Sequence, residues 1–392
     1  MKRVEALDLA EKRTFVRVDF NVPMDKNGNI TDDGRIVAAL PTLQTIVQQN
    51  AKLILASHLG RPRGERRAEF SLAPVARRLS ELLGREVTLA PDCIGAEVQK
   101  IITEMAPGDV VLLENLRFHP QEQANDSDFG KALAGLCDVF INDAFAVCHR
   151  EHASVHAMVA HVAEKGAGML LQKELDYFQK AMENPRRPLV AVVGGAKVSS
   201  KLTALTNMLK RVDRIIIGGA MANTFLKQQG AGVGRSLVED DCLPDAARII
   251  ASAAERDIDL FLPVDLVVAE SMREDAAVRT VTVQGVPENM MALDIGPETA
   301  RAYHQALQDA GTVVWNGPMG VFEMPPFSGG TMSLAKSIAG CSGLTIIGGG
   351  DTGAAVHMAG VAADMTYIST GGGAFLTLLE GRVLPAVEVL CE

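Results

Sequence analysis

Short apolar runs, rich in β-branched residues, recur along the chain, and each is followed by a polar or glycine-rich turn and then by a segment of helical periodicity. This alternation predicts strand–helix units that build parallel α/β sheets. The strands predicted in the first half cover residues 14–20, 52–56, 86–89, 109–113 and 138–141. Those predicted in the second half cover residues 189–193, 214–217, 259–262, 312–315, 344–347 and 365–369.

A connecting helix is predicted between the two halves of the chain. Apolar residues stand at helical spacing from Leu171 to Met182, and two prolines, the first of them Pro185, stop the pattern. We therefore predict a helix over about 170–184, which ends an N-terminal domain of residues 1–184. A second domain begins at residue 185, in agreement with a length of 392 residues, which is long for a single hydrophobic core.

The composition is that of a folded protein, with 47% hydrophobic residues, 22% charged residues and 36 glycines. A net charge of −10 argues against nucleic-acid or acidic-membrane partners, because such binding depends on basic surface. The six cysteines show neither C-x-x-C nor Cys/His metal spacing, which argues against a zinc site or a disulfide framework. No apolar run reaches the roughly 18 residues of a membrane span. We expect a cytoplasmic protein.

The residues that follow the predicted strands are the candidates for a functional site, because ligands of open α/β sheets bind beyond the carboxyl ends of the strands. In the first half these residues are polar and basic. Several arginines at one edge repel one another unless a multiply charged anion lies between them, and a guanidinium group suits phosphate or carboxylate. The alternative for each arginine is a solvated surface position. The candidates are Asp19, Phe20, Asn21, Arg35, His58, Arg61, Arg63, Arg117 and Arg150; His58 fits a structural or a functional role, and His119 and His152 are expected to be structural.

In the second half glycines follow the predicted strands, in five segments. Without a Cβ atom, glycine lets backbone N–H groups approach an anion, and each following helix adds the positive end of its dipole. A tight turn alone explains one such segment, but five in one sheet favour a phosphate-binding edge. The segments are VVGGAK (192–197), IIIGGAMANT (215–224), WNGPMG (315–320), IIGGGDTG (346–353) and ISTGGGAF (368–375).

Two lysines at the first of these turns, Lys197 and Lys201, are four residues apart. If a helix begins there, the pair places two like charges on one face near the helix N-terminus. Their mutual repulsion costs about 0.2–0.5 kcal/mol, and repulsion between a lysine and the positive end of the helix dipole costs about 0.3–1 kcal/mol. Bound phosphates would offset this repulsion, with one lysine at the nucleotide and the other at the transferred group. The alternative is two solvated surface lysines. The spacing does not fit a Walker A loop.

The segment from Gly348 to Gly353 matches the G-x-G-x-x-G pattern, which makes a nicotinamide-dependent dehydrogenase an alternative. Such an enzyme needs an acidic residue at the end of the next strand, where this chain reads YISTGGG. Asp351 suits a magnesium or phosphate–water site, with helix capping as its structural alternative. An arginine-lined half and a glycine-lined half together indicate phosphoryl transfer, with closure that excludes water. A non-catalytic phosphate-metabolite-binding protein is the other alternative.

Ten segments, in order, resemble the phosphoglycerate kinase family over essentially the whole chain. They are VRVDFNVP (16–23), GRI (34–36), SHLGRP (57–62), ENLRF (114–118), HREHAS (149–154), VVGGAKVSSKL (192–202), GGAMANTFL (218–226), WNGPMGVFE (315–323), GGGDT (348–352) and STGGGA (369–374). The chain departs from the usual family pattern at Gly353, at Phe375 and at residues 146–148, where altered packing beside Arg150 is expected.

The resemblance implies two Rossmann-like domains, each a parallel β-sheet flanked by helices, joined by the connecting helix and separated by a cleft. The second domain would cover residues 185–375, and a tail, residues 376–392, would pack back on the first domain. The implied protein is a monomeric glycolytic kinase without nucleic-acid or membrane partners. It would transfer a phosphoryl group reversibly from the acyl phosphate of 1,3-bisphosphoglycerate to Mg-ADP, with hinge closure, and give 3-phosphoglycerate and ATP.

The resemblance also assigns individual residues, matched position by position. The glycerate substrate would be bound by Asp19, Phe20, Asn21, Arg35, His58, Leu59, Gly60, Arg61, Arg117 and Arg150. Arg35 and Lys197 would be catalytic, because they contact the transferred group. The nucleotide would be bound by Lys201, Glu323, Gly349, Gly350, Asp351 and Thr352, with Asp351 also holding Mg²⁺.

Overall fold

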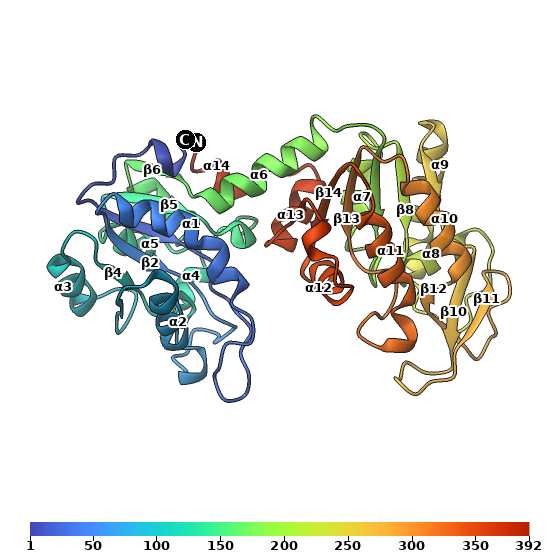
Figure 1. The fold of residues 1–392 in the computed structure, drawn as a ribbon, viewed down its shortest axis with the longest axis horizontal. Coiled ribbons are helices and arrows are strands. Elements are labelled where there is room, and N and C mark those ends of the chain that lie inside the picture. Colours follow the sequence, from blue (N-terminus) through green and yellow to red (C-terminus); the bar gives the residue numbers. More distant parts are fainter. Residues whose placement is uncertain (392) are drawn as a thin grey trace. The chain divides into compact units, whose positions relative to one another are not determined.

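The computed structural model describes residues 1–391, and the chain divides into two compact units (Figure 1). Unit 1 comprises Met1–Leu175 and the segment from Val383 onward, whereas unit 2 comprises Asp176–Arg382. The chain passes from one unit to the other within α6 (Met169–Met182), the helix predicted over 170–184. Residue 392, the last of the predicted tail, lies outside the described residues.

Unit 1 is built on a sheet of six parallel strands, in the order β3-β4-β2-β1-β5-β6, with helices packed on it (Figure 1). The strands are β1 (Arg13–Arg17), β2 (Lys52–Ala56), β3 (Val87–Leu89), β4 (Val110–Leu112), β5 (Val139–Asn142) and β6 (Glu164–Ala167). The helices are α1 (Gly34–Gln48), α2 (Ala73–Leu83), α3 (Ala96–Glu104), α4 (Pro120–Gln123), α5 (Ser127–Ala134) and α14 (Pro385–Glu388).

Helix α2 illustrates how the sequence sets these elements. Val75, Ala76 and Leu79 are buried at helical spacing and join the core that the central strands form. Gly84 ends the helix in the left-handed conformation, with φ +65°, which a residue without a Cβ atom adopts at no steric cost. Burial on both sides of the sheet is the usual condition of parallel strands.

Unit 2 contains a second sheet of six parallel strands, in the order β15-β14-β13-β7-β8-β9. These strands are β7 (Leu189–Val193), β8 (Arg214–Ile217), β9 (Asp259–Phe261), β13 (Thr312–Asn316), β14 (Leu344–Gly348) and β15 (Tyr367–Ile368). The helices are α7 (Leu202–Met208), α8 (Met221–Gln228), α9 (Leu243–Glu255), α10 (Pro297–Leu307), α11 (Gly329–Ala339), α12 (Gly350–Met358) and α13 (Gly372–Leu379). Among the described residues, none of the helices has the length and apolar character required to span a bilayer.

The prediction of two parallel α/β sheets is confirmed, and each predicted strand is present. The first strand is shorter than predicted, since it ends at Arg17 instead of residue 20. Val18 and Phe20 are wholly buried beyond its end, so the apolar pattern continues where the strand does not.

The sequence analysis missed β6 and a three-stranded antiparallel sheet, in the order β11-β10-β12, made of β10 (Asp265–Ala269), β11 (Arg279–Thr282) and β12 (Met291–Ile295). Strand β9 ends at Phe261 and β10 begins at Asp265, which leaves no room for the crossover helix that a parallel neighbour requires. The strand–helix alternation on which the prediction was based therefore does not apply there.

Candidate functional site

The candidate site of unit 1 lies at the carboxyl ends of β1, β2, β4 and β5, where the parallel order of the strands places it. We call its residues the arginine rim. They are Asp19, Phe20, Asn21, Arg35, His58, Leu59, Gly60, Arg61, Arg117 and Arg150.

Direct contacts join half of the rim. Arg35 forms an ion pair with Asp19, whose side chain is only 9% exposed. The Asn21 side chain accepts a hydrogen bond of 2.8 Å from Gly60 N, and the Arg117 guanidinium donates one of 2.7 Å to Gly60 O. These contacts tie the loops after β1, β2 and β4 together and hold both guanidinium groups in place.

Phe20 and Leu59 are rim residues whose side chains are buried in the unit. The Phe20 amide donates to Ser57 Oγ at 2.8 Å, and the Leu59 amide donates to Asn115 Oδ1 at 3.2 Å. Neither residue therefore offers a side chain or an amide to a ligand, and both serve to fix the course of the loops.

Arg61 and Arg150 are the exposed arginines of the rim. Residues 146–148, just before Arg150, pack into unit 1, and Cys148 is wholly buried. The carbonyl group of Cys148 accepts a hydrogen bond of 3.2 Å from Ala386 N, in α14. The Arg150 amide donates to Val147 O at 3.0 Å, so the unusual residues at 146–148 contact both the C-terminal segment and the arginine rim.

Arg17, on the buried strand β1, is a residue of this region that the sequence analysis did not identify. Its side chain is wholly buried, and its Nε atom donates to Ser154 Oγ at 2.9 Å. The Nη2 atom of the Arg17 guanidinium group lies 3.2 Å from His58 Nδ1. Because a guanidinium group only donates, His58 Nδ1 is the acceptor, and the neutral ring carries its proton on Nε2. The sequence signal is a charged residue between Val16 and Val18, in a strand that is otherwise apolar.

A buried carboxylate supports Arg17 from within the unit. Glu122, in α4, is 0% exposed and accepts hydrogen bonds from Ser154 Oγ at 2.6 Å and from Ser154 N at 2.8 Å. Ser154 thus joins the carboxylate to the guanidinium group of Arg17. The Glu122 carboxylate, together with that of Asp19, supports the cation that orients His58.

The arginine rim has an excess of positive charge. Burial, and then the charge of Arg17, hold the pKa of His58 well below its usual value. Burial, followed by Arg17 and Arg117, lowers the pKa of His152 to about 3. Burial, followed by Arg17 and Arg150, lowers the pKa of Arg117 to about 10. Each group is destabilised in its charged form by neighbouring cations, so a bound anion with several charges would relieve the repulsion.

The candidate site of unit 2 lies at the glycine-rich turns that follow β7, β8, β13 and β14, and we call these turns the glycine rim. They border a cavity of about 700 Å³. Residues that line it include Gly195, Gly219, Pro318, Glu323 and Asp351. The volume is within the usual range for a small-molecule site.

The expectation that Lys197 and Lys201 share one face of a helix is wrong. Helix α7 begins at Leu202, so both lysines precede it, and Lys197 is exposed in the segment between β7 and α7. Lys201 Nζ donates to Gly194 O at 2.7 Å, to Asn316 O at 2.9 Å and to Asn316 Oδ1 at 2.6 Å. Three oxygen atoms therefore anchor one ammonium group, and the like-charge repulsion expected within a helix does not arise.

Most glycines of the rim serve to pack the turns against one another. The amides of Gly194, Gly195 and Gly219 donate to the carbonyl groups of Asn316, Pro318 and Met319, so they are not available to an anion. A Cβ atom on Gly194 would lie 2.1 Å from Pro318 O, which explains why this turn requires glycine. The expectation that these amides bind phosphate is therefore corrected for the turns after β7 and β8.

The N-terminus of α12 differs from these turns. Within the described residues, the amides of Gly350, Asp351 and Thr352 donate to no other residue, and Gly349 precedes them with φ +97°. Thr352 is buried, and its Oγ1 accepts a hydrogen bond of 2.7 Å from Gly317 N. Asp351 is exposed and lines the cavity. Free amides beside an exposed carboxylate suit phosphate groups and a hard cation such as Mg²⁺.

Comparisons with known proteins concern the family and the fold of the chain. A sequence model of the phosphoglycerate kinase family matches residues 4–382. The phosphoglycerate kinase of Geotalea uraniireducens is 57% identical to the chain, in an alignment that covers 98% of the chain and 97% of that relative. The phosphoglycerate kinase of Desulfotalea psychrophila is also 57% identical, and the alignment covers 100% of both sequences. Two solved structures of phosphoglycerate kinase match the whole chain, and in each case 98% of the solved chain is covered. The structure from Coxiella burnetii has a TM-score of 0.90 at 44% identity, and that from Pyrococcus horikoshii has a TM-score of 0.86 at 31% identity.

Proposed function

The chain belongs to the phosphoglycerate kinase family, and from this premise we propose which residues bind each substrate and carry out the transfer. It is a glycolytic kinase, a phosphotransferase that uses a carboxyl group as acceptor. The reaction moves a phosphoryl group reversibly between 1,3-bisphosphoglycerate and ADP and gives 3-phosphoglycerate and ATP. The relatives favour neither the dehydrogenase nor the non-catalytic binding protein.

The arginine rim is the proposed site of the glycerate substrate. The observation that carries this assignment is Arg117, which is 5% exposed and has a buried Nε atom without a hydrogen-bond partner in the described chain. A buried donor of this kind, among several other cations, is stabilised by an anionic ligand. His58 would donate from Nε2, the ring nitrogen that carries its proton. The ion pair with Asp19 would hold Arg35 toward the transferred group.

The glycine rim is the proposed nucleotide site. The free amides at residues 350–352 would bind phosphate oxygens, and Lys201 would neutralise their charge. Glu323, which lines the same cavity, would contact the ribose. The exposed Asp351 carboxylate would hold Mg²⁺, which supplies neutralising charge to the phosphate chain when bound. The carboxylate of 3-phosphoglycerate is already ionised at neutral pH, so this chain needs no general base.

Transfer requires the two substrates to meet, although their proposed binding residues belong to different units. We therefore retain hinge closure as part of the proposal, because an enclosed site also keeps water from the phosphoryl donor. A monomer in the cytoplasm is likewise a proposal. The six free cysteines of the described chain support a reducing compartment, and the monomer is carried over from the family resemblance.

The Asp351→Asn variant tests the nucleotide site. We expect the KM for Mg-ATP to rise by at least about 10- to 100-fold, because an amide replaces a charged magnesium ligand, while the KM for 3-phosphoglycerate changes little. The measurement is a coupled assay that starts from ATP and 3-phosphoglycerate. Asp364→Asn, at another exposed aspartate of unit 2, is the control. An unchanged KM for Mg-ATP would remove Asp351 from the proposed site.

Nucleotide binding is expected to weaken as the pH rises through about 8. Burial, opposed by the charge of Asp351, lowers the pKa of Lys201 to about 8. Below that pH the charged ammonium attracts phosphate, and above it the neutral amine does not. The KM for ATP should therefore increase between about pH 7 and pH 9. Lys201→Arg keeps its charge throughout this range and should flatten the increase, whereas an equal increase in both proteins would rule out Lys201 as its source.

A further inference from the structure

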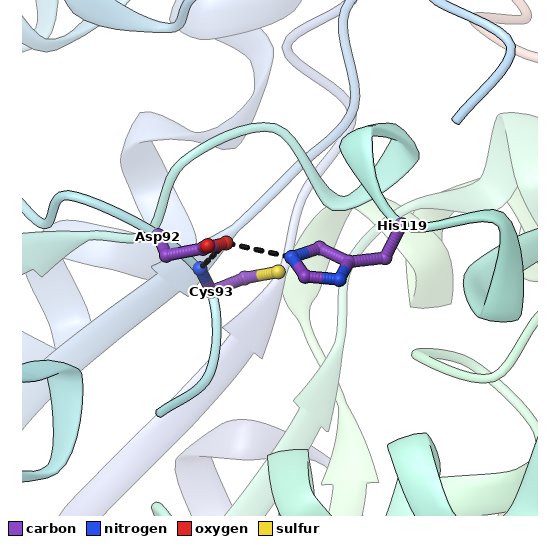
Figure 2. A group of neighbouring side chains, drawn as sticks. All are labelled: Asp92, Cys93 and His119. Atoms are coloured by element: carbon purple, nitrogen blue, oxygen red, sulfur yellow. Dashed lines mark hydrogen bonds and ion pairs between the residues drawn. The ribbon is translucent and has the colours of Figure 1, made fainter. Parts of the chain in front are cut away.

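Three side chains that commonly bind metals lie together in unit 1, outside the arginine rim (Figure 2). Asp92 and Cys93 follow β3, and His119 lies at the N-terminus of α4. One carboxylate oxygen, the thiol sulfur and one imidazole nitrogen lie within 4.8 Å of one another. Figure 2 shows the carboxylate and the thiol at the same edge of the imidazole ring.

The backbone and neighbouring side chains hold this cluster in place. Asp92 Oδ1 accepts a hydrogen bond from Cys93 N at 2.7 Å and lies 2.7 Å from His119 Nε2. The His119 ring packs against Phe129, with 5.3 Å between the ring centres. The turn after β3 and the start of α4 are therefore brought together by the fold, so residues far apart in the sequence form one cluster.

We propose that Asp92, Cys93 and His119 bind a divalent transition metal of the zinc class, with water as the fourth ligand. Sulfur, imidazole nitrogen and carboxylate oxygen are all established zinc ligands, and a thiolate disfavours Mg²⁺ and Ca²⁺. Cys93 is wholly buried, whereas the Asp92 and His119 side chains are 34% and 24% exposed. An ion can thus enter from the solvent side and keep a water molecule there.

Binding is balanced in protons. The Cys93 thiol loses its proton to solvent and becomes a thiolate ligand. The imidazole of His119 coordinates through Nε2, and the proton it shares with Asp92 moves to Nδ1, so the ring stays neutral. The Asp92 carboxylate exchanges a hydrogen bond for a metal bond.

One cation competes for the same carboxylate. Arg66 lies 3.7 Å from Asp92 Oδ2, on the oxygen that does not face His119. Its guanidinium group also donates to Pro91 O and lies 5.8 Å from the centre of the Phe118 ring. Because its side chain is 57% exposed and an exposed ion pair of this length contributes little free energy, a metal at Asp92 would cost only this weak pair, and Arg66 can keep its other two contacts. The sequence spacing of cysteine and histidine gave no indication of this site, because only the fold places Cys93 beside His119.

The test is a titration of the full-length protein, freed of metal with a chelator, first with Co²⁺ and then with Zn²⁺. We expect a thiolate-to-cobalt charge-transfer band that Zn²⁺ removes. Cys93→Ser should abolish the band and weaken Zn²⁺ binding. Loss of a side chain that only supports a metal ligand costs about 10- to 100-fold in affinity, so loss of a ligand itself should cost at least as much. Cys137→Ser is the matched control, because Cys137 is also buried and also stands directly next to an aspartate in the sequence, here Asp138. That aspartate forms an ion pair with Arg13 and not with a histidine, so no metal site is expected there.

His119→Gln, at a partly exposed position, is a second variant that covers the case in which Cys93→Ser does not fold, and it should lose the same band. Thermal unfolding identifies a folding defect in either variant. The proposal is overturned if the wild-type protein shows no charge-transfer band, or if it binds Zn²⁺ no more tightly than the folded variants. Either result would leave the cluster as a hydrogen-bonded pair beside a buried thiol.

Discussion

Replacing Lys197 with alanine is expected to lower kcat by about 100- to 1,000-fold and to leave the KM for 3-phosphoglycerate nearly unchanged. The side chain is exposed in the segment between β7 and α7. Lys201, by contrast, is anchored by three oxygen atoms. We infer that Lys197 is the lysine that can follow the charge developing on the transferred phosphoryl group. Steady-state kinetics with both substrates varied provide the measurement.

Lys210→Ala is the matched control for this variant, since Lys210 is another exposed lysine of unit 2. It should leave kcat and both KM values unchanged. Lys197→Arg should retain part of the activity, because it keeps the charge but changes its geometry. Near-normal turnover in Lys197→Ala would exclude a transition-state role for this lysine.

Replacing Arg17 with methionine is expected to destabilise the protein by about 3–5 kcal/mol, because the substitution leaves a buried carboxylate without its cation. Glu122 and Ser154 are both 0% exposed, so water cannot take the place of the guanidinium group. The same change removes the donor to His58 Nδ1. We therefore expect the folded fraction of the variant to bind 3-phosphoglycerate more weakly than the wild-type protein. Urea unfolding and the KM for 3-phosphoglycerate are the two measurements.

The tautomer of His58 separates a positioning role from a purely structural one. Nitrogen NMR of the wild-type ring should show Nδ1 as the acceptor and the proton on Nε2, and Arg17→Lys should alter this state even if the variant is well folded. Arg77→Met, at an exposed arginine of the same unit, should affect neither stability nor the histidine. A wild-type ring protonated on Nδ1 would contradict the assignment.

The arginine rim could be predicted from the sequence because a parallel sheet brings the ends of its strands to one edge. Residues after β1, β2 and β4 needed only that topology to become neighbours, and Asn21, Gly60 and Arg117 are joined by hydrogen bonds. Arg17 could not be found in the same way, since it lies within a strand. Its role depends on which side chains face it across the interior, and no local pattern contains that information.

The glycine rim shows where a local pattern misleads. Two glycines after a strand are compatible with free amides and with tight packing of loops, and only the three-dimensional structure distinguishes the two. At Gly194 and Gly219 packing is the reason, because their amides are bound to the neighbouring turn. At Gly350, the first residue of α12, the amide is free. The lysine pair was misjudged for a related reason, since the start of α7 was placed too early.

The discontinuity of unit 1 has a consequence for the protein as it leaves the ribosome. Leu384, Ala386 and Leu390 are at most 3% exposed and belong to unit 1, yet they are translated after all of unit 2. At about 5–20 residues per second, the roughly 200 residues of unit 2 delay their arrival by roughly 10–40 s. During that interval, while unit 2 is being synthesised, the surface around Cys148 lacks its cover. A nascent chain of this protein should therefore present a chaperone with an unfinished first half until the second half has been translated.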